Sequence, residues 1–289
     1  MAEWKKVGVV GCGLMGSGIV EVAARSGFDV VVREATRELL DKGLGKVKKS
    51  MDTGVEKGKL KPEERDAASR RIRGTLDLGD FRDCDVVIEA ITEDPKAKRE
   101  VHAALDAIVK PEAVFASNTS SISITEMATA TKRPERFIGL HFFNPVPVMK
   151  LLEIVRGLRT SDETVALSKA FGEKLGKVSI LAKDTPGFIV NRLLVPYLLS
   201  AIRAYEQGLG TKEDIDRGMT LGCAHPMGPL TLSDFVGLDT ALFIADVMFD
   251  EYRTPEYAAP PLLRRMVAAG FTGRKSGRGF YDWSSGQPK

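Results

Sequence analysis

The stretch Val7-Gly-Val-Val-Gly11-Cys-Gly13-Leu-Met-Gly16 decides how this chain folds. Its first part, Val7 to Val10, is a short apolar run that ends in glycine, which is typical of a fully buried parallel strand. Helical spacing follows from Leu14 to Arg25, and a second apolar strand is expected from Asp29 to Val32. The chain therefore opens with a strand, a glycine turn, a helix and a strand, which together make a βαβ unit.

A lysine-rich helical segment interrupts this pattern after the second strand. Residues 36–71 have helical spacing with a break near Gly58 to Pro62, so we expect a helical hairpin inserted before the third strand. The later strands are predicted at Asp85–Ile88, Ala113–Ala116, Phe137–Leu140, Leu152–Val155 and Val178–Leu181. Helical stretches lie between several of them, and this alternation predicts a mostly parallel sheet covered on both faces.

A change of pattern near Lys183 indicates a second domain. The sequence Asp184-Thr-Pro-Gly187 punctuates the chain there, because proline and glycine together break regular structure. The stretches beyond it look helical: Phe188–Glu206, Lys212–Leu221, Leu230–Phe249 and Leu262–Ala269. We therefore predict an α/β fold, with a Rossmann-type doubly wound sheet and its helical insertion in residues 1–184, and an all-α C-terminal domain in residues 185–289.

The composition argues against several classes of protein. A net charge of +3 over 289 residues is too small to indicate binding to nucleic acid or to a membrane surface. No apolar run approaches the roughly 18 residues that a membrane-spanning helix needs. Cys12, Cys84 and Cys223 form no C-x-x-C pair, so we expect neither a disulfide framework nor a metal site. The start of the chain lacks the pattern of a signal peptide, and we expect a cytoplasmic protein.

The glycines Gly11, Gly13 and Gly16 form a G-x-G-x-x-G between the first strand and the first helix. In such a turn the first glycine permits the sharp bend, the second lets the backbone approach a pyrophosphate, and the third lets helix and strand pack closely. The start of the helix offers free N–H groups and a positive dipole end to phosphates. The context therefore predicts a bound dinucleotide.

An acidic residue, Glu34, ends the second strand. Its carboxylate is suited to accept hydrogen bonds from an adenosine ribose and to repel a 2′-phosphate, which favours NAD over NADP. Arg33 is the complication, because an arginine at this point attracts a 2′-phosphate or stacks on the adenine. We expect NAD, with NADP as the alternative.

The three histidines are the candidates for acid–base chemistry. Oxidising a secondary alcohol with a nicotinamide also removes the hydroxyl proton, and a base with a pKa near 7 suits that step. His141 follows directly on a predicted strand, where crevice residues of an α/β sheet lie. His102 is in a charged helical stretch and is expected at the surface. His225, in a proline-bounded loop, is expected to be structural, with a substrate-side role as the alternative.

Several segments together resemble a known family. They occur in order along nearly the whole chain: Ser117-Asn-Thr-Ser-Ser121, His141-Phe-Phe-Asn-Pro145, Leu152-Glu153, Pro186-Gly-Phe-Ile-Val-Asn-Arg192, His225-Pro-Met-Gly-Pro229 and Gly273-Arg-Lys-Ser-Gly277. They look like the signature segments of the L-3-hydroxyacyl-CoA dehydrogenases, closest to the members that act on 3-hydroxybutyryl-CoA. This resemblance implies an oxidoreductase that interconverts a short-chain L-3-hydroxyacyl-CoA and the 3-ketoacyl-CoA with NAD(H).

The resemblance also implies roles for four residues in the reaction. His141 would be the general acid/base and Glu153 the carboxylate that orients it. Glu153 lies among Leu151, Leu152 and Ile154, where an unpartnered acid would be costly, and this supports the pairing. Ser120 and Asn191 would surround the substrate's C3 oxygen and thioester carbonyl, although Asn191 in an apolar helix is also explained by backbone hydrogen bonding.

Binding residues are implied in the same way. For NAD they are the glycine turn with Leu14 and Met15, then Glu34, Glu93, Lys98, Ser120, Asn144 and Lys275. For the CoA nucleotide they are Ser50, Lys57 and Ser120, although the interspersed acids also suit a solvated helix face. The partner is an acyl-CoA substrate, and the family likeness together with the small second domain predicts a homodimer.

Two other interpretations stay open at this stage. Another two-domain dehydrogenase, of the phosphogluconate or hydroxyisobutyrate kind, would share the opening βαβ unit but use a lysine as base. A non-catalytic relative that binds NAD or CoA would keep the glycines and be expected to lose the acid–base pair. The preferred acyl-chain length and the physiological direction are not readable from the sequence.

Overall fold

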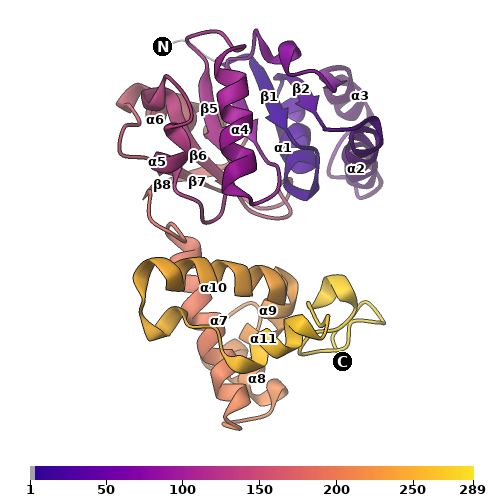
Figure 1. Cartoon of the computed structure of the whole chain (residues 1–289). Helices are drawn as coiled ribbons and strands as arrows, with labels where there is room; N and C mark the ends of the chain where they lie inside the picture. Colours follow the sequence, from indigo (N-terminus) through magenta and orange to yellow (C-terminus); the bar gives the residue numbers. More distant parts are fainter. Residues whose placement is uncertain (1–3) are drawn as a thin grey trace. The chain divides into compact units, whose positions relative to one another are not determined.

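The computed structural model describes residues 4–289, and the chain forms two compact units that divide between Thr185 and Pro186 (Figure 1). The first unit is built on one sheet of eight strands in the order β3-β2-β1-β4-β5-β6-β7-β8. The strands are β1 Lys6–Val10, β2 Asp29–Arg33, β3 Ile72–Thr75, β4 Val86–Glu89, β5 Val114–Ser117, β6 Phe137–Phe142, β7 Leu151–Arg156 and β8 Val178–Lys183.

All neighbouring strands are parallel except β6 and β7, which are antiparallel. The strand order reverses between β1 and β4, because the chain adds β2 and β3 on one side before it crosses to β4 on the other. In open α/β sheets, ligands bind outside the carboxyl ends of the strands at such a reversal. The predicted fold class is confirmed, and the topology directs attention to the carboxyl ends of β1 and β4.

One of the eight strands was not predicted from the sequence. β3, Ile72-Arg-Gly-Thr75, follows the helical hairpin and pairs only with β2, so it forms an edge of the sheet. Its residues are half-buried or exposed, and only Ile72 is strongly apolar. An edge strand of this kind lacks the continuous apolar run that reveals a central strand.

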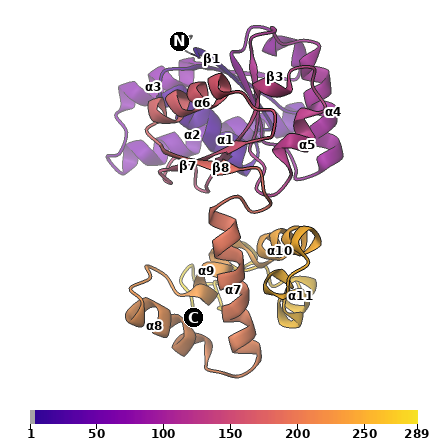
Figure 2. The same cartoon turned by 90° about the vertical axis from the view of Figure 1, so that its left-hand side faces the viewer.

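Helices cover both faces of the sheet. They are α1 Leu14–Arg25, α2 Arg37–Glu56, α3 Pro62–Arg70, α4 Pro95–Asp106, α5 Ile124–Ala128 and α6 Asp162–Lys174. Figure 2 shows α4 and α5 together on one side of the sheet, with α1 and α6 on the other. The insertion is the predicted hairpin, in which α2 ends at Glu56 and Pro62 begins α3.

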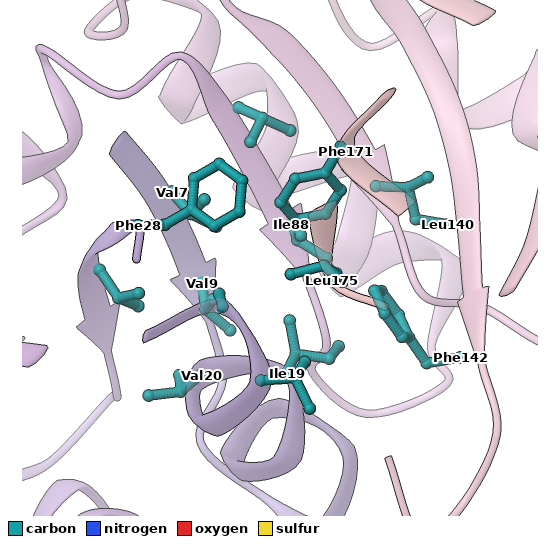
Figure 3. Close-up of a cluster of buried hydrophobic side chains, with 14 of the residues drawn as sticks. Val7, Val9, Ile19, Val20, Phe28, Ile88, Leu140, Phe142, Phe171 and Leu175 are labelled. Atoms are coloured by element: carbon teal, nitrogen blue, oxygen red, sulfur yellow. The ribbon is translucent and has the colours of Figure 1, made fainter. Parts of the chain in front are cut away.

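The main core lies between the sheet and the helices α1 and α6. Phe171 of α6 meets Trp4 and Phe28 with ring centroids 5.2 and 5.1 Å apart. Figure 3 shows the side chains of this cluster from strands and helices, among them Val7, Val9, Ile19, Ile88, Leu140, Phe142 and Phe171. All of these are buried, so the strands that carry the site rest on a close-packed base.

The second unit is helical. Its helices are α7 Val190–Glu206, α8 Lys212–Gly222, α9 Pro229–Val236, α10 Leu238–Tyr252 and α11 Pro261–Ala268. The prediction of one helix over 230–249 was wrong, because Gly237 with φ 95° separates α9 from α10. Left-handed backbone of this kind cannot continue a right-handed helix. Across residues 4–289, no helix is both long and apolar enough to cross a membrane.

Candidate active site

Each glycine in the turn between β1 and α1 is required for a different physical reason. Gly11 has φ 95°, and a Cβ there would lie 2.6 Å from the Ala90 carbonyl oxygen. A Cβ on Gly16 would lie 1.9 Å from the carbonyl oxygen of Gly11, so helix and turn could not pack as they do. A Cβ on Gly13 would meet open space. The turn is therefore tight at its two ends and open at Gly13, as the approach of a ligand to the backbone requires.

The start of α1 is left available to an anion. Gly13 is its N-cap and has no side chain, and the first turn, which starts at Leu14, has no acidic residue. Leu14 is 66% exposed and Met15 is half-buried, so the first turn lies at the surface. The N–H groups of this 12-residue helix and its dipole favour a phosphate at this position.

Glu34, which the sequence predicts to bind the adenosine ribose, lies against the glycine turn. One carboxylate oxygen accepts a hydrogen bond from the Cys12 N–H at 2.5 Å, and the other accepts one from the Ala35 N–H at 3.2 Å. Burial, together with the Glu34 charge, raises the pKa of the Cys12 thiol to about 12, so the thiol stays neutral. Arg33 instead donates through Nε to the Leu76 carbonyl at 3.3 Å.

His141 and Glu153 form the centre of the site. They are directly paired residues of the antiparallel strands β6 and β7, so their side chains project from the same face of the sheet. His141 Nδ1 lies 2.7 Å from Glu153 Oε2, and the two side chains are 5% and 0% exposed. Ser120, in the loop after β5, places its Oγ 3.0 Å from His141 Nε2.

This arrangement assigns different tasks to the two ring nitrogens. A carboxylate oxygen only accepts hydrogen bonds, so Nδ1 carries a proton and donates it to Glu153. Nε2, the nitrogen that faces Ser120, is then the one that is able to exchange a proton. Asn118 holds the loop in place, because its side-chain oxygen accepts from the Phe142 N–H at 2.9 Å. The sheet and the loop after β5 thus orient a histidine for acid–base chemistry.

Glu93 and Lys98, both predicted to bind the cofactor, lie beside Ser120. The Lys98 ammonium is 3.1 Å from Glu93 Oε2, and Glu93 Oε1 accepts from the Ser120 N–H at 3.0 Å. The same carboxylate accepts from the Thr119 hydroxyl. A second acid, Glu89, lies 2.7 Å from the Lys98 ammonium.

Glu89 and Thr119 were missed in the sequence. Glu89 ends the apolar strand Val86-Val-Ile-Glu89, and the argument that an acid among apolar residues needs a partner, applied to Glu153, would have found it. No comparable signal marks Thr119, whose importance depends on the fold of the loop.

Three other predicted site residues of the first unit lie outside this cluster. Ser50 and Lys57 are exposed, at the last part of α2 and at its C-cap, and Asn144 is exposed after β6. Asn191 and Lys275 belong to the second unit. Asn191 is buried in the first turn of α7, and Lys275 pairs with Asp239 at 2.6 Å.

The other two histidines, His102 and His225, lie in surroundings that differ from each other. The prediction that His102 lies at the surface was wrong: it is fully buried on α4, edge-on to the rings of Phe115 and Phe137. The charged residues around it occupy the outer face, while Lys98, His102 and Leu105 form a buried stripe at helical spacing. His225 is half-buried and its Nδ1 lies 2.9 Å from the Tyr197 hydroxyl. Within residues 4–289, no group of three or more His, Cys, Asp or Glu residues could hold a metal ion.

Comparison with known proteins adds to this geometry. The family model of the 3-hydroxyacyl-CoA dehydrogenase NAD-binding domain matches residues 6–185, and that of the C-terminal domain matches residues 187–283. The chain belongs to the 3-hydroxyacyl-CoA dehydrogenase family. This membership confirms the predicted family, the predicted fold class and the expectation of an NAD-dependent oxidoreductase.

Relatives within the 3-hydroxyacyl-CoA dehydrogenase family are similar over nearly the whole chain. A 3-hydroxybutyryl-CoA dehydrogenase from Mycobacterium tuberculosis is 52% identical over 281 residues, which cover 96% of this chain and 98% of that protein. The crystal structure of M. tuberculosis FadB2 has a TM-score of 0.96 at 52% identity and covers 97% of this chain and 99% of that one. The (S)-3-hydroxybutyryl-CoA dehydrogenase PaaH1 from Ralstonia eutropha has a TM-score of 0.93 at 46% identity, with the same coverage.

Proposed function

We propose that this chain interconverts a short-chain L-3-hydroxyacyl-CoA, 3-hydroxybutyryl-CoA, and its 3-ketoacyl-CoA, acetoacetyl-CoA, by hydride transfer with NAD(H). The observation that carries the proposal is the pairing of His141 with Glu153 on adjacent strands, with Ser120 at the opposite ring nitrogen. The names of the relatives that match the whole chain support the choice of substrate.

The dinucleotide is held by the glycine turn, by the N–H groups at the start of α1, and by Glu34 on the ribose. NAD, when bound, supplies the acceptor or donor of the hydride. Glu93, Lys98, Asn144 and Lys275 complete its binding site in this proposal. The fit rests on the open face at Gly13 and on the Glu34 carboxylate beside the turn. A carboxylate at this position disfavours the 2′-phosphate of NADP.

The chain's own acid–base chemistry centres on His141. In the oxidative direction Nε2 accepts the proton of the substrate's C3 hydroxyl, and in the reductive direction the imidazolium returns it. Glu153, fully buried, keeps the ring in one tautomer and stabilises its charged form. The Ser120 hydroxyl and the Asn191 amide hold the substrate's C3 oxygen and thioester carbonyl in this proposal.

CoA binding is assigned to the inserted hairpin together with Ser120. Ser50, near the end of α2, and Lys57, at its C-cap, are exposed in a lysine-rich part of the chain, which suits the phosphates of CoA. We also propose that residues 1–184 are the NAD-binding domain and that residues 185–289 serve substrate binding and formation of a homodimer. Leu193, Leu209 and Leu221 of the second unit are 72%, 80% and 84% exposed, and burial of these leucines in a homodimer would remove apolar surface from water. Cys12, Cys84 and Cys223 are free thiols, which fits the cytoplasm.

A rate measurement tests the proposal. Acetoacetyl-CoA should be reduced with NADH, and much more slowly with NADPH, while free hydroxy acids such as 3-hydroxyisobutyrate should not be oxidised with NAD⁺. Turnover of free hydroxy acids alone would favour another two-domain dehydrogenase. NADH binding without turnover of any of these substrates would favour a non-catalytic relative.

A further inference from the structure

A buried group of charges lies at the carboxyl end of β4, where the strand order reverses. Glu89 is fully buried and Lys98 is 1% exposed. Burying two charges is costly unless they are paired and their remaining hydrogen-bonding atoms are satisfied. A pair of this kind at a ligand-binding edge therefore calls for a reason beyond stability.

Glu89 is satisfied on both carboxylate oxygens. Oε1 accepts from the Lys98 ammonium at 2.7 Å and from the Ile91 N–H at 2.7 Å. Oε2 accepts from the Ser117 hydroxyl at 2.7 Å. Ser117 and Glu89 are paired residues on β5 and β4, so the sheet itself holds the carboxylate in one orientation. The lysine that it binds has a long, flexible side chain, which gains a fixed direction from this partner.

His102 does not share the charge of Glu89. Its Nε2 is 3.9 Å from Glu89 Oε2, beyond hydrogen-bonding distance. Complete burial, and then the nearby Lys98 charge, lowers the pKa of His102 to about 3, so the ring is neutral. Lys98 is thus the cation that balances Glu89.

The contacts continue from Lys98 to the catalytic histidine. The ammonium also pairs with Glu93 at 3.1 Å, and Glu93 accepts from the Ser120 N–H at 3.0 Å. Ser120 in turn places its hydroxyl 3.0 Å from His141 Nε2. A continuous polar chain therefore connects the end of β4 with the site of proton exchange.

We propose that Glu89 is a positioning residue for the cofactor: it fixes Lys98, and through Lys98 it fixes Glu93 beside the loop of Ser120. The inference rests on the proposed function, in which Lys98 and Glu93 contact NAD. Glu89 itself touches neither cofactor nor substrate in this proposal. Its loss should therefore weaken dinucleotide binding more than it alters the proton transfer of His141.

The test is a fluorescence titration of the purified protein with NADH, which measures the dissociation constant without any turnover. Glu89→Gln removes the charge and keeps the shape. We expect the Kd for NADH to rise about tenfold, the lower end of the loss seen when partners that orient metal-binding side chains are removed. The matched control is Glu21→Gln, because Glu21 is also buried and paired with a cation, Arg25 at 3.1 Å, but lies on α1 outside this network. The control should bind NADH within about twofold of the wild type.

Steady-state kinetics separate positioning from a general loss of structure. With saturating NADH, Glu89→Gln should keep the shape of the wild-type pH profile of kcat, because the pair of His141 and Glu153 is unchanged. An NADH affinity equal to that of the wild type would overturn the proposal, and so would an equal loss in both variants. Should Glu89→Gln not fold, the more conservative Glu89→Asp is titrated under the same criteria. Failure of the wild type to reduce acetoacetyl-CoA would instead count against the proposed function, while the NADH titration would still decide the role of Glu89.

Discussion

The two ends of strand β4 carry similar ion pairs in different surroundings. At the amino end, Asp85 pairs with Lys110 at 2.5 Å and also accepts from the Lys5 and Lys6 N–H groups at 2.6 and 2.8 Å. At the carboxyl end, Glu89 pairs with Lys98 at 2.7 Å. The Asp85 side chain is 21% exposed, whereas that of Glu89 is fully buried.

The difference lies in what each pair is connected to. The contacts of the Asp85 carboxylate join the start of β1, the start of β4 and the segment before β5. The contacts of Glu89 continue through Lys98 and Glu93 to the loop of Ser120. In α/β sheets the carboxyl edge binds ligands, so we expect the same type of pair to serve cofactor binding at that end and stability at the other. Two variants at the carboxyl edge of the sheet, one variant of Asp85 and one pH condition test whether chemistry and stability divide between the two edges.

Replacing His141 with glutamine should have the largest effect. The variant keeps a polar side chain at the carboxyl edge but has no imidazole to exchange a proton with the substrate, so kcat for acetoacetyl-CoA reduction should fall about a thousandfold or more. The Kd for NADH, measured by fluorescence titration, serves as the control and should change little. Near-normal turnover would mean that the chemistry lies elsewhere.

Replacing Glu153 with glutamine should have the next largest effect. The amide oxygen can still accept from Nδ1, but it carries no charge to stabilise the imidazolium, so kcat should fall about a hundredfold. NADH affinity should again be retained. The prediction fails if kcat is unchanged while the folded variant binds NADH normally.

Asp85→Asn should change stability without changing catalysis. The amide loses the charge that pairs with Lys110, and we expect the free energy of unfolding to fall by about 1–3 kcal/mol. Thermal unfolding measures that loss, and kcat should stay within about twofold of the wild type. A large fall in kcat at temperatures where the variant is fully folded would abolish the distinction between the two ends of β4.

The pH dependence of stability should show the smallest effect. Partial burial opposes ionisation of Asp85, but hydrogen bonds from the Lys110 ammonium and the Lys6 and Lys5 N–H groups outweigh it and lower the pKa of this carboxyl. Its stabilising contribution is therefore present above the ordinary value of 3.8 and is lost as pH falls through the lower, folded-state value. Denaturant unfolding of wild type and Asp85→Asn should converge as pH drops below about 4. A difference that stays constant down to pH 2 would contradict this account.

Much of the fold was predictable because its signals are local. The glycine turn, the apolar central strands and the proline that begins α3 each leave a mark within a few residues. Edge strand β3 and the break at Gly237 leave no such local signal. Half-buried residues suffice for a strand at the edge of a sheet, and a single glycine within an apolar stretch does not reveal that its φ is positive. The surface prediction for His102 failed because the charges around it are sequence neighbours that face outward.

The site was predictable only in part. The pairing of His141 with Glu153 followed from family likeness and from the cost of an isolated acid, and the structure places the two side chains in contact. Their roles in catalysis stay predictions. Glu89 could have been found in the same way, but its partners could not, because Lys98 is nine residues away and Ser117 is 28 residues away. A separation of this kind becomes a contact only when the sheet assembles.

The antiparallel pairing of β6 with β7 has a practical consequence for variation in this protein. The register of the two strands sets the distance between imidazole and carboxylate, and the eight-residue connection 143–150 does not. Extra residues in that connection would change the loop but would leave His141 and Glu153 paired on adjacent strands. A single residue inserted within β7, before Glu153, would rotate every later side chain to the opposite face and separate the pair.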